Sequence, residues 1–193
     1  MRSTLTSWPA RTAFCLLASF LLPVTALAGF EFKGTKSLVA VAADGARLPI
    51  GTVQFMPTGS GTATFSLGLQ VEAFTDHFLS MKEFKCLTSA REITCHVPFP
   101  YRNPAIVGTG QLVWLEHSLL FLYKSPSEFG AKLWNGVYYQ FQEQGDALVG
   151  SPRAVDLNEI SAPPADDSVP PFGAENRHDM PADARWIRQL VIE

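Results

Sequence analysis

Apolar and polar residues alternate along much of the chain with the period of two that is typical of half-buried β-strands. From Thr64 to Ala73 the odd-numbered positions are all apolar, whereas the even-numbered ones are polar or glycine. Val137, Tyr139 and Phe141 alternate with glutamines in the same way. The same reasoning predicts further strands at 30–36, 37–42, 50–56, 78–86, 93–99, 111–123 and 147–150.

Turn signals separate these runs, for example at Asp44-Gly45, at Gly59-Ser60-Gly61 and at Gly145-Asp146. Within the long run 111–123, the residues from Leu119 to Leu122 are all apolar, which predicts burial on both faces of a sheet. Eight to ten short strands predict a mainly β fold, an antiparallel β-barrel or sandwich. The pattern resembles small secreted barrels of the lipocalin-like type, and the likeness is one of architecture that implies no ligand.

One segment favours a helix over a strand. Ser125-Pro126-Ser127-Glu128 has the sequence of a capping box with proline at the first helical position. Phe129 and Leu133 are then spaced to stack on one helix face, and Asn135-Gly136 is a good helix stop. The alternative is an Asn-Gly hairpin turn that joins 132–134 to 137–139. We expect the short helix.

The amino terminus has the order of a secretory signal peptide. Arg2 and Arg11 precede an apolar run at 13–22, and Ala26-Leu27-Ala28 supplies the small residues of a cleavage site. An apolar run of about ten residues is too short to cross roughly 30 Å of hydrocarbon. No later stretch reaches 18 apolar residues, so we expect residues 1–28 to be removed. The mature chain would then be soluble, without a transmembrane segment, and periplasmic or extracellular.

Two cysteines remain after such cleavage, Cys86 and Cys95, an even pair in an oxidising compartment. If they face each other across a hairpin, opposed residue numbers sum to 181, and the apolar residues collect largely on the cysteine side. Residues 89–92 then form a four-residue turn. A redox or metal pair is the alternative, but the spacing is not C-x-x-C and no ligand-spaced histidine pair accompanies it. The sequence predicts a structural disulfide.

Composition changes after Leu157. Residues 161–183 hold five prolines and five acidic residues against one base, Arg177, so this stretch is expected to be an extended acidic linker. An apolar end follows, from Trp186 to Ile192. We therefore expect an antiparallel β domain at 29–157, a Pro-rich linker at 158–185 and a C-terminal segment at 186–193 that docks on the β domain.

Composition narrows the function classes. The full chain is 47% hydrophobic and 17% charged, which excludes a coiled coil, a collagenous chain and a highly charged nucleic-acid binder. Without Arg2 and Arg11, 13 basic residues stand against 18 acidic ones, a net charge of −5. Because no basic run is present, no nucleic-acid partner is expected.

No motif for catalysis, for a metal or for a cofactor is found. The four histidines lack ligand spacing, and no G-x-S-x-G nucleophile motif occurs. His96 is expected on a solvent face. Glu116 and His117 are expected to point to opposite faces of a strand, where they cannot cooperate.

Aromatic residues with polar tips supply the candidate binding surface. Its members are Phe99, Tyr101, Arg102, Trp134, Tyr138 and Tyr139. The leading hypothesis is a non-enzymatic exported protein that binds a small molecule, a glycan or an envelope protein. The alternative is a scaffold or accessory subunit of an envelope complex, and an enzyme whose site is not readable from sequence ranks third.

Overall fold

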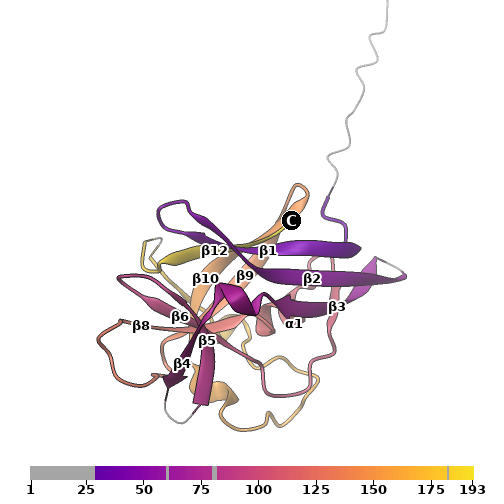
Figure 1. The fold of residues 1–193 in the computed structure, drawn as a ribbon. Coiled ribbons are helices and arrows are strands. Elements are labelled where there is room, and N and C mark those ends of the chain that lie inside the picture. Colours follow the sequence, from indigo (N-terminus) through magenta and orange to yellow (C-terminus); the bar gives the residue numbers. More distant parts are fainter. Residues whose placement is uncertain (1–28, 60, 80–81, 182) are drawn as a thin grey trace, which may run out of the picture.

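The computed structural model describes residues 29–59, 61–79, 82–181 and 183–193. The signal peptide predicted at 1–28 lies outside the described residues. Figure 1 shows a chain built from strands with short helical turns between them. The strands are β1 Gly34–Ala42, β2 Arg47–Gly59, β3 Thr62–Leu69, β4 Thr75–Leu79, β5 Lys82–Thr88, β6 Ile93–Val97, β7 Ile106–Gly108, β8 Leu120–Lys124, β9 Gly136–Gln144, β10 Ala147–Val155, β11 His178–Asp179 and β12 Ile187–Ile192. The helical elements are α1 Val113–His117 and the 3-10 turns η1 Val71–Ala73, η2 Leu157–Ile160 and η3 Ala174–Asn176.

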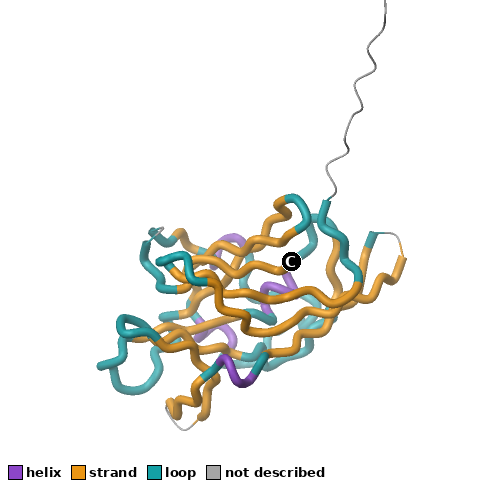
Figure 2. The backbone as a smooth tube through the Cα atoms, turned by 45° about the horizontal axis from the view of Figure 1, so that its top comes forward, coloured by secondary structure: helices purple, strands orange, loops and turns teal. Residues whose placement is uncertain are grey.

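These strands form one antiparallel sheet that does not close on itself. Its strand order is β4-β5-β6-β8-β9-β10-β12-β1-β2-β3-β7, and β11 pairs with β10. Figure 2 shows the strands curving round a common interior. The prediction of a mainly antiparallel β fold with one short helix is confirmed, although the helix lies elsewhere in the chain than expected.

The last strand, β12, occupies an inner position in this sheet. Leu190, Val191 and Ile192 pair with β1 on one side and with β10 on the other. In Figure 1, β12 (yellow) accordingly lies beside β1 (indigo), so the two ends of the described chain meet in one sheet. The apolar C-terminal residues are thereby removed from solvent.

Two apolar clusters cover the two faces of the central strands. The interior cluster contains one face each of β1, β2, β12 and β9, including Val137, Tyr139 and Phe141 of β9. The second cluster contains Tyr138 from the other face of β9, together with both cysteines and Phe172. Leu120, Phe121 and Leu122 of β8 are at most 1% exposed and alternate between the two clusters, which confirms the predicted burial on both faces.

The disulfide Cys86–Cys95 joins β5 to β6. Cys86 pairs with Cys95, Leu87 with Thr94 and Thr88 with Ile93, so the predicted register of 181 is confirmed. Both cysteines are fully buried. The turn at 89–92 closes through two hydrogen bonds, because the N–H and the Oγ of Ser89 each donate to the backbone oxygen of Glu92 at 2.9 Å.

The single strand predicted at 111–123 is wrong. Residues 113–117 form helix α1, and only Leu120–Lys124 are extended, as β8. Leu115, Glu116 and His117 are all buried, so the helix is enclosed and has no polar face that would reveal its period. A short apolar run of this kind does not distinguish a strand from a buried helix.

The helix predicted at 126–135 is also wrong, since this segment is a loop between β8 and β9. Half of the capping box does form, because the Ser125 N–H donates to Glu128 Oε2 at 2.7 Å. The two residues of its expected apolar face do not share one buried side: Phe129 is fully exposed, whereas Leu133 packs against the second cluster. The Asn-Gly hairpin alternative is not formed either, because Gly136 already belongs to β9.

Strand boundaries differ at several further places: for example, the strand predicted from Thr64 to Ala73 ends at Leu69, and the strand predicted at 147–150 continues to Val155. The strands predicted at 30–36 and 37–42 are one strand, β1, that begins at Gly34. The strand predicted at 78–86 is divided between β4 and β5, which pair antiparallel with each other. The turns predicted at Gly45 and Gly145 are confirmed, and both glycines have positive φ, at 88° and 64°.

The acidic segment after β10 lies along the body of the protein. Its residues are mostly irregular, with the turns η2 and η3 and the two-residue strand β11. Ile160 and Phe172 are buried in the second apolar cluster. Tyr101 fixes the start of the segment, because its hydroxyl donates to the Ile160 oxygen at 2.9 Å.

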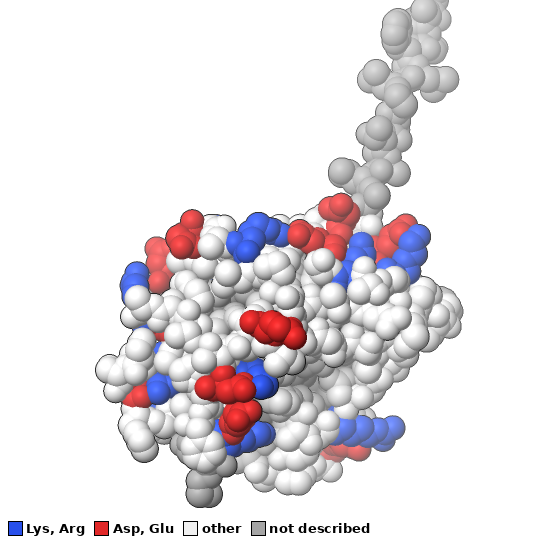
Figure 3. Space-filling view, viewed as in Figure 1, with Lys and Arg blue, Asp and Glu red and all other residues white. Residues whose placement is uncertain are grey.

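Charged side chains are interspersed with large uncharged areas on the face drawn in Figure 3. Within the described ranges, no helix has the length and apolar character needed to span a membrane.

Candidate functional site

A cleft lies where β8 and β9 stop pairing. The two strands are bonded only at Phe121–Val137 and Leu122–Gly136, so the rest of β9 has no β8 partner. Helix α1 lies beside β9 at this point. The Phe141 N–H of β9 donates to Oε1 of Glu116 at 2.7 Å, where a neighbouring strand would otherwise supply the acceptor. One carboxylate thus satisfies a backbone donor that the ladder leaves free.

The cleft has a volume of about 540 Å³ and is partly open to solvent. We call it the Arg177 cleft. Most of its wall is apolar or aromatic, and four polar side chains, including an acid and a base, converge in it. Its lining residues are Pro104, Ile106, Gly110, Gln111, Leu112, Val113, Trp114, Glu116, Gln140, Phe141 and Arg177. An apolar wall with a few convergent polar groups is typical of a small-molecule site.

Glu116 is the acid of the cleft, and both of its oxygens already have protein partners. Its Oε2 accepts a hydrogen bond from the Tyr138 hydroxyl, and its Oε1 accepts from Phe141. Burial raises the pKa of Glu116, while the two hydrogen bonds and the positive charge of Arg177 oppose this rise. The pKa of the Tyr138 hydroxyl is also raised, by burial and then by the Glu116 charge, so it remains a donor.

Arg177 is the base of the cleft, and its side chain is 15% exposed. Its Nε and Nη2 donate to the Phe172 oxygen at 2.9 and 2.7 Å, and its guanidinium carbon lies 4.2 Å from the centre of the Tyr138 ring. The remaining nitrogen, Nη1, has only a distant ion pair with Glu116, at 4.0 Å. Nη1, which donates no hydrogen bond to the protein, therefore has donor capacity left for a ligand.

His117 lies behind the cleft and holds Phe172. Its Nδ1–H donates to the Val113 oxygen at 2.7 Å, while its Nε2 accepts from the Phe172 N–H at 3.2 Å. The His117 ring stacks on the Phe172 ring and meets Tyr138 edge-on. Burial lowers the pKa of His117 to about 4, and the nearby Arg177 charge acts in the same direction. His117 is thus neutral at pH 7.

The prediction that Glu116 and His117 point to opposite faces of a strand is wrong, because both lie on α1. Both side chains are buried and both contact Tyr138, one through its hydroxyl and the other through its ring. Both residues have a structural role, because the polar atoms of both side chains are already hydrogen-bonded within the protein.

The candidate binding surface proposed from sequence is not one surface. Tyr138 and Tyr139 are at most 1% exposed and belong to the two opposite apolar clusters, because adjacent strand residues point to opposite faces. Phe99 and Tyr101 contact each other edge-on and are partly buried. Their neighbour Arg102 is exposed, 3.6 Å from Asp167. Trp134 is 63% exposed on the loop between β8 and β9.

The expectation that His96 lies on a solvent face is wrong. His96 is 8% exposed, its Nε2 is 3.0 Å from the Ser118 oxygen, and its ring meets Phe121 edge-on. His96 shares its face of the sheet with Leu87 and Phe121 of the interior cluster, so this face is turned towards the core and not towards solvent. Burial accordingly lowers the pKa of His96.

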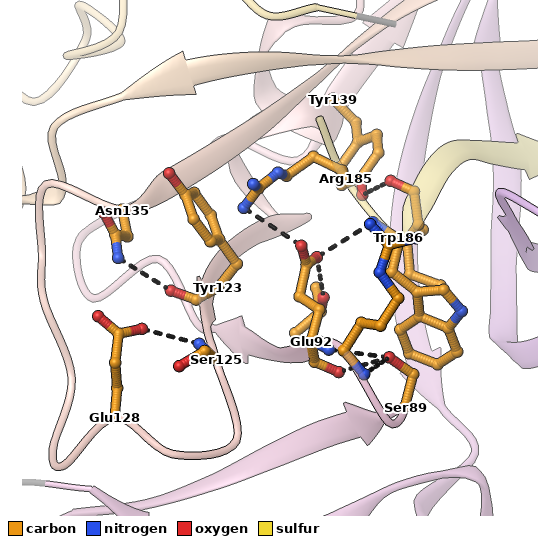
Figure 4. Close-up of polar contacts among 12 residues, drawn as sticks. Ser89, Glu92, Tyr123, Ser125, Glu128, Asn135, Tyr139, Arg185 and Trp186 are labelled. Atoms are coloured by element: carbon orange, nitrogen blue, oxygen red, sulfur yellow. Dashed lines mark hydrogen bonds and ion pairs between the residues drawn. The ribbon is translucent and has the colours of Figure 1, made fainter. Parts of the chain in front are cut away.

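A second polar cluster joins β12 to the turn between β5 and β6 (Figure 4). Glu92 Oε1 accepts from Thr94 Oγ1 at 2.9 Å and from the Trp186 N–H at 3.4 Å. Its Oε2 is 3.3 Å from Arg185 Nη1, and the Arg185 guanidinium lies over Tyr123, 3.3 Å from the ring centre. A cavity of about 230 Å³ adjoins this cluster. Because the Glu92 carboxylate is fully engaged, the cluster anchors the C-terminal strand.

Sequence reasoning missed the residues of the Arg177 cleft. Two signals were present: Arg177 is the one base in the acidic segment at 161–183, and Glu116-His117 lies within an apolar run. No group of three or more metal-binding side chains occurs among the described residues. Comparisons with protein-family models, with curated proteins and with solved structures give no match for this chain.

Proposed function

We propose that the protein is an exported, non-enzymatic binding protein whose Arg177 cleft takes a small organic molecule. That molecule has an apolar body and an oxygen acceptor, such as a carbonyl or carboxylate group. The observation that carries this proposal is Nη1 of Arg177, which has only the 4.0 Å ion pair with Glu116, in a cleft with a mainly apolar wall. The disulfide and the signal-like amino terminus support export to the periplasm or the extracellular space.

Binding fits this site better than catalysis. A general acid or base needs a polar atom free to exchange a proton with substrate. Glu116 and His117 have both of their polar side-chain atoms bonded to protein groups. The perturbed pKa values of this cluster are therefore explained by its burial and its role in packing.

The proposal is tested with indole-3-carboxylate and indole as matched probes by saturation-transfer NMR. We expect the acid to bind more strongly than indole, because only the acid offers Arg177 an acceptor. The exposed residue Gln111 lines the cleft, so Gln111→Trp should fill it and abolish binding. Gln54→Trp, on an exposed position of β2, is the control that should leave binding unchanged. Equal binding to both variants would refute the proposal.

A second candidate function, an accessory subunit of an envelope complex, is favoured by one observation. Phe129 and Trp134 are exposed large apolar side chains on the same loop, between β8 and β9. Exposed aromatic residues of this kind are typical of protein contacts. Native mass spectrometry of the protein from its own host tests this function, with Phe129→Ser and Trp134→Ser expected to release the partner. A monomeric mass for the wild-type protein would count against it.

A further inference from the structure

Glu143 carries a buried oxygen without a partner. Its side-chain atom Oε1 is enclosed by the protein and accepts no hydrogen bond. The residue follows Val137, Tyr139 and Phe141 on β9 in steps of two, so it continues the interior face of the strand. Among the described residues, no Lys, Arg or His forms an ion pair with it. A buried carboxylate oxygen without a donor is costly.

Gly29 lies next to this carboxylate. A Cβ built on Gly29 would be 4.0 Å from Glu143 Oε2, which places the Gly29 backbone nitrogen within about 6.5 Å of that oxygen. The following residue holds Gly29 in place, since Phe30 is buried and its ring packs against Phe32 and Phe55. The start of the described chain is thus fixed at the end of the interior that Glu143 occupies.

The two lysines that follow Gly29 in the sequence, Lys33 and Lys36, interact with groups other than Glu143. Lys33 pairs with Glu31 at 2.6 Å, and the Lys36 ammonium lies 5.2 Å from the centre of the Phe30 ring. In the uncleaved chain the Gly29 nitrogen is an uncharged amide with one N–H. Among the residues that the structure describes, no positive charge therefore pairs with Glu143.

We propose that removal of the signal peptide completes this site, because the new α-ammonium group of Gly29 pairs with the Glu143 carboxylate. Water cleaves the Ala28–Gly29 bond, leaving a carboxylate on Ala28 and an amine on Gly29, and this amine takes up a proton at neutral pH. Cleavage thus converts an orphaned carboxylate into an ion pair and stabilises the folded protein. This inference rests on the export and cleavage assumed in the proposed function.

The test separates the ion pair from the cleavage itself. A fusion cut in vitro yields protein that starts at Gly29, whatever happens in the host. The pKa of its α-amino group is measured by NMR after ¹⁵N labelling. We expect it to lie about one unit above the usual value of about 7.7–8.0. Glu143→Gln should remove that rise, whereas the matched control Glu31→Gln should retain most of it.

Acetylation of the Gly29 amine gives an independent readout. It should lower the melting temperature of the wild-type protein and leave that of Glu143→Gln nearly unchanged. An α-amino pKa that is the same in the wild type and in the Glu143→Gln variant, or an equal effect of acetylation on both, would overturn the ion pair. Amino-terminal sequencing of the exported protein tests the cleavage separately, and a start other than Gly29 would overturn the maturation step alone.

Discussion

The backbone N–H of Phe172 donates a hydrogen bond to Nε2 of His117 across 55 residues of sequence. This bond requires Nε2 to be unprotonated, and the bond from Nδ1–H to Val113 fixes the complementary tautomer. The acidic segment after β10 is thereby attached to α1. Arg177 is brought over the Tyr138 ring and into the wall of the cleft. The shape of the cleft depends on this attachment.

Acid should weaken the folded protein through His117. Its folded pKa, about 4, lies below its ordinary value of 6.5, so between these values the unfolded chain binds more protons. The stabilisation is complete above pH 6.5 and is lost as the pH falls towards 4, by about 3 kcal/mol. The lowered pKa of His96 also makes the folded protein less stable as the pH falls. The raised pKa of Glu116 has the opposite effect above pH 4.5, because it makes the folded protein more stable as the pH falls.

The check is urea unfolding between pH 4 and 7.5. The variant His117→Gln should have a shallower loss of stability over pH 4–6.5 than the wild type. The exposed His178 supplies the control, and His178→Gln should keep the wild-type slope. If the unfolding free energies of the wild type and of His117→Gln fell in parallel with pH, the conclusion that His117 is neutral in the folded protein would be contradicted.

Phe172 should be the main apolar anchor of the acidic segment. It is fully buried between His117 and Tyr138, so Phe172→Ala should lower the free energy of unfolding by about 3–5 kcal/mol. Val169 is 57% exposed on the same segment, and Val169→Ala should cost little. Thermal unfolding of both variants decides this, and similar melting temperatures would show that the segment is not anchored.

The disulfide should stabilise the β5–β6 hairpin mainly through the unfolded state. The closed loop is short, with a sequence separation of 9, and chain entropy gives about 2.7 kcal/mol for a loop of about ten residues. Replacing both cysteines by serine should lower stability by about this amount. Reductant should lower the stability of the wild type and leave the double variant unchanged. Two free thiols in the exported protein would refute the bond.

Gly136 should not tolerate a side chain. A Cβ there would lie 2.5 Å from the Val155 oxygen and 2.7 Å from Leu157 Cγ, so Gly136→Ala should destabilise by about 2–3 kcal/mol. Gly68, in β3, is the matched control, because its nearest neighbour would be at an ordinary 3.4 Å. Equal unfolding free energies for the two variants, measured in urea, would contradict this packing.

Features that depend on local periodicity could be predicted from the sequence. The pairing of Cys86 with Cys95 follows from alternation about a four-residue turn, and the burial of β8 follows from its unbroken apolar run. Gly136 illustrates the limit: the sequence interpretation assigned it to a helix stop, whereas the structure needs it for close contact with Val155. Such a requirement comes from tertiary packing, which local sequence does not reveal.

The cleft could not be predicted because its residues are far apart in sequence. Glu116 and Arg177 come together only because Phe172 anchors the later segment beside α1. The aromatic surface was misjudged for a related reason: Tyr138 and Tyr139 have polar tips, but each hydroxyl has a buried acceptor, on Glu116 and on Ile187. Composition alone does not distinguish a buried tyrosine from one at a recognition surface.

The most direct test of the binding proposal is an NMR titration of the ¹⁵N-labelled protein with indole-3-carboxylate. We expect shifts confined to the Trp114 indole N–H, the Gln111 and Gln140 side-chain amides and the Arg177 guanidinium, since these four residues line the cleft. Resonances of the loop at 125–135 should not move. Shifts at Phe129 and Trp134 instead, or none at the cleft residues, would contradict the assignment of the Arg177 cleft as the binding site.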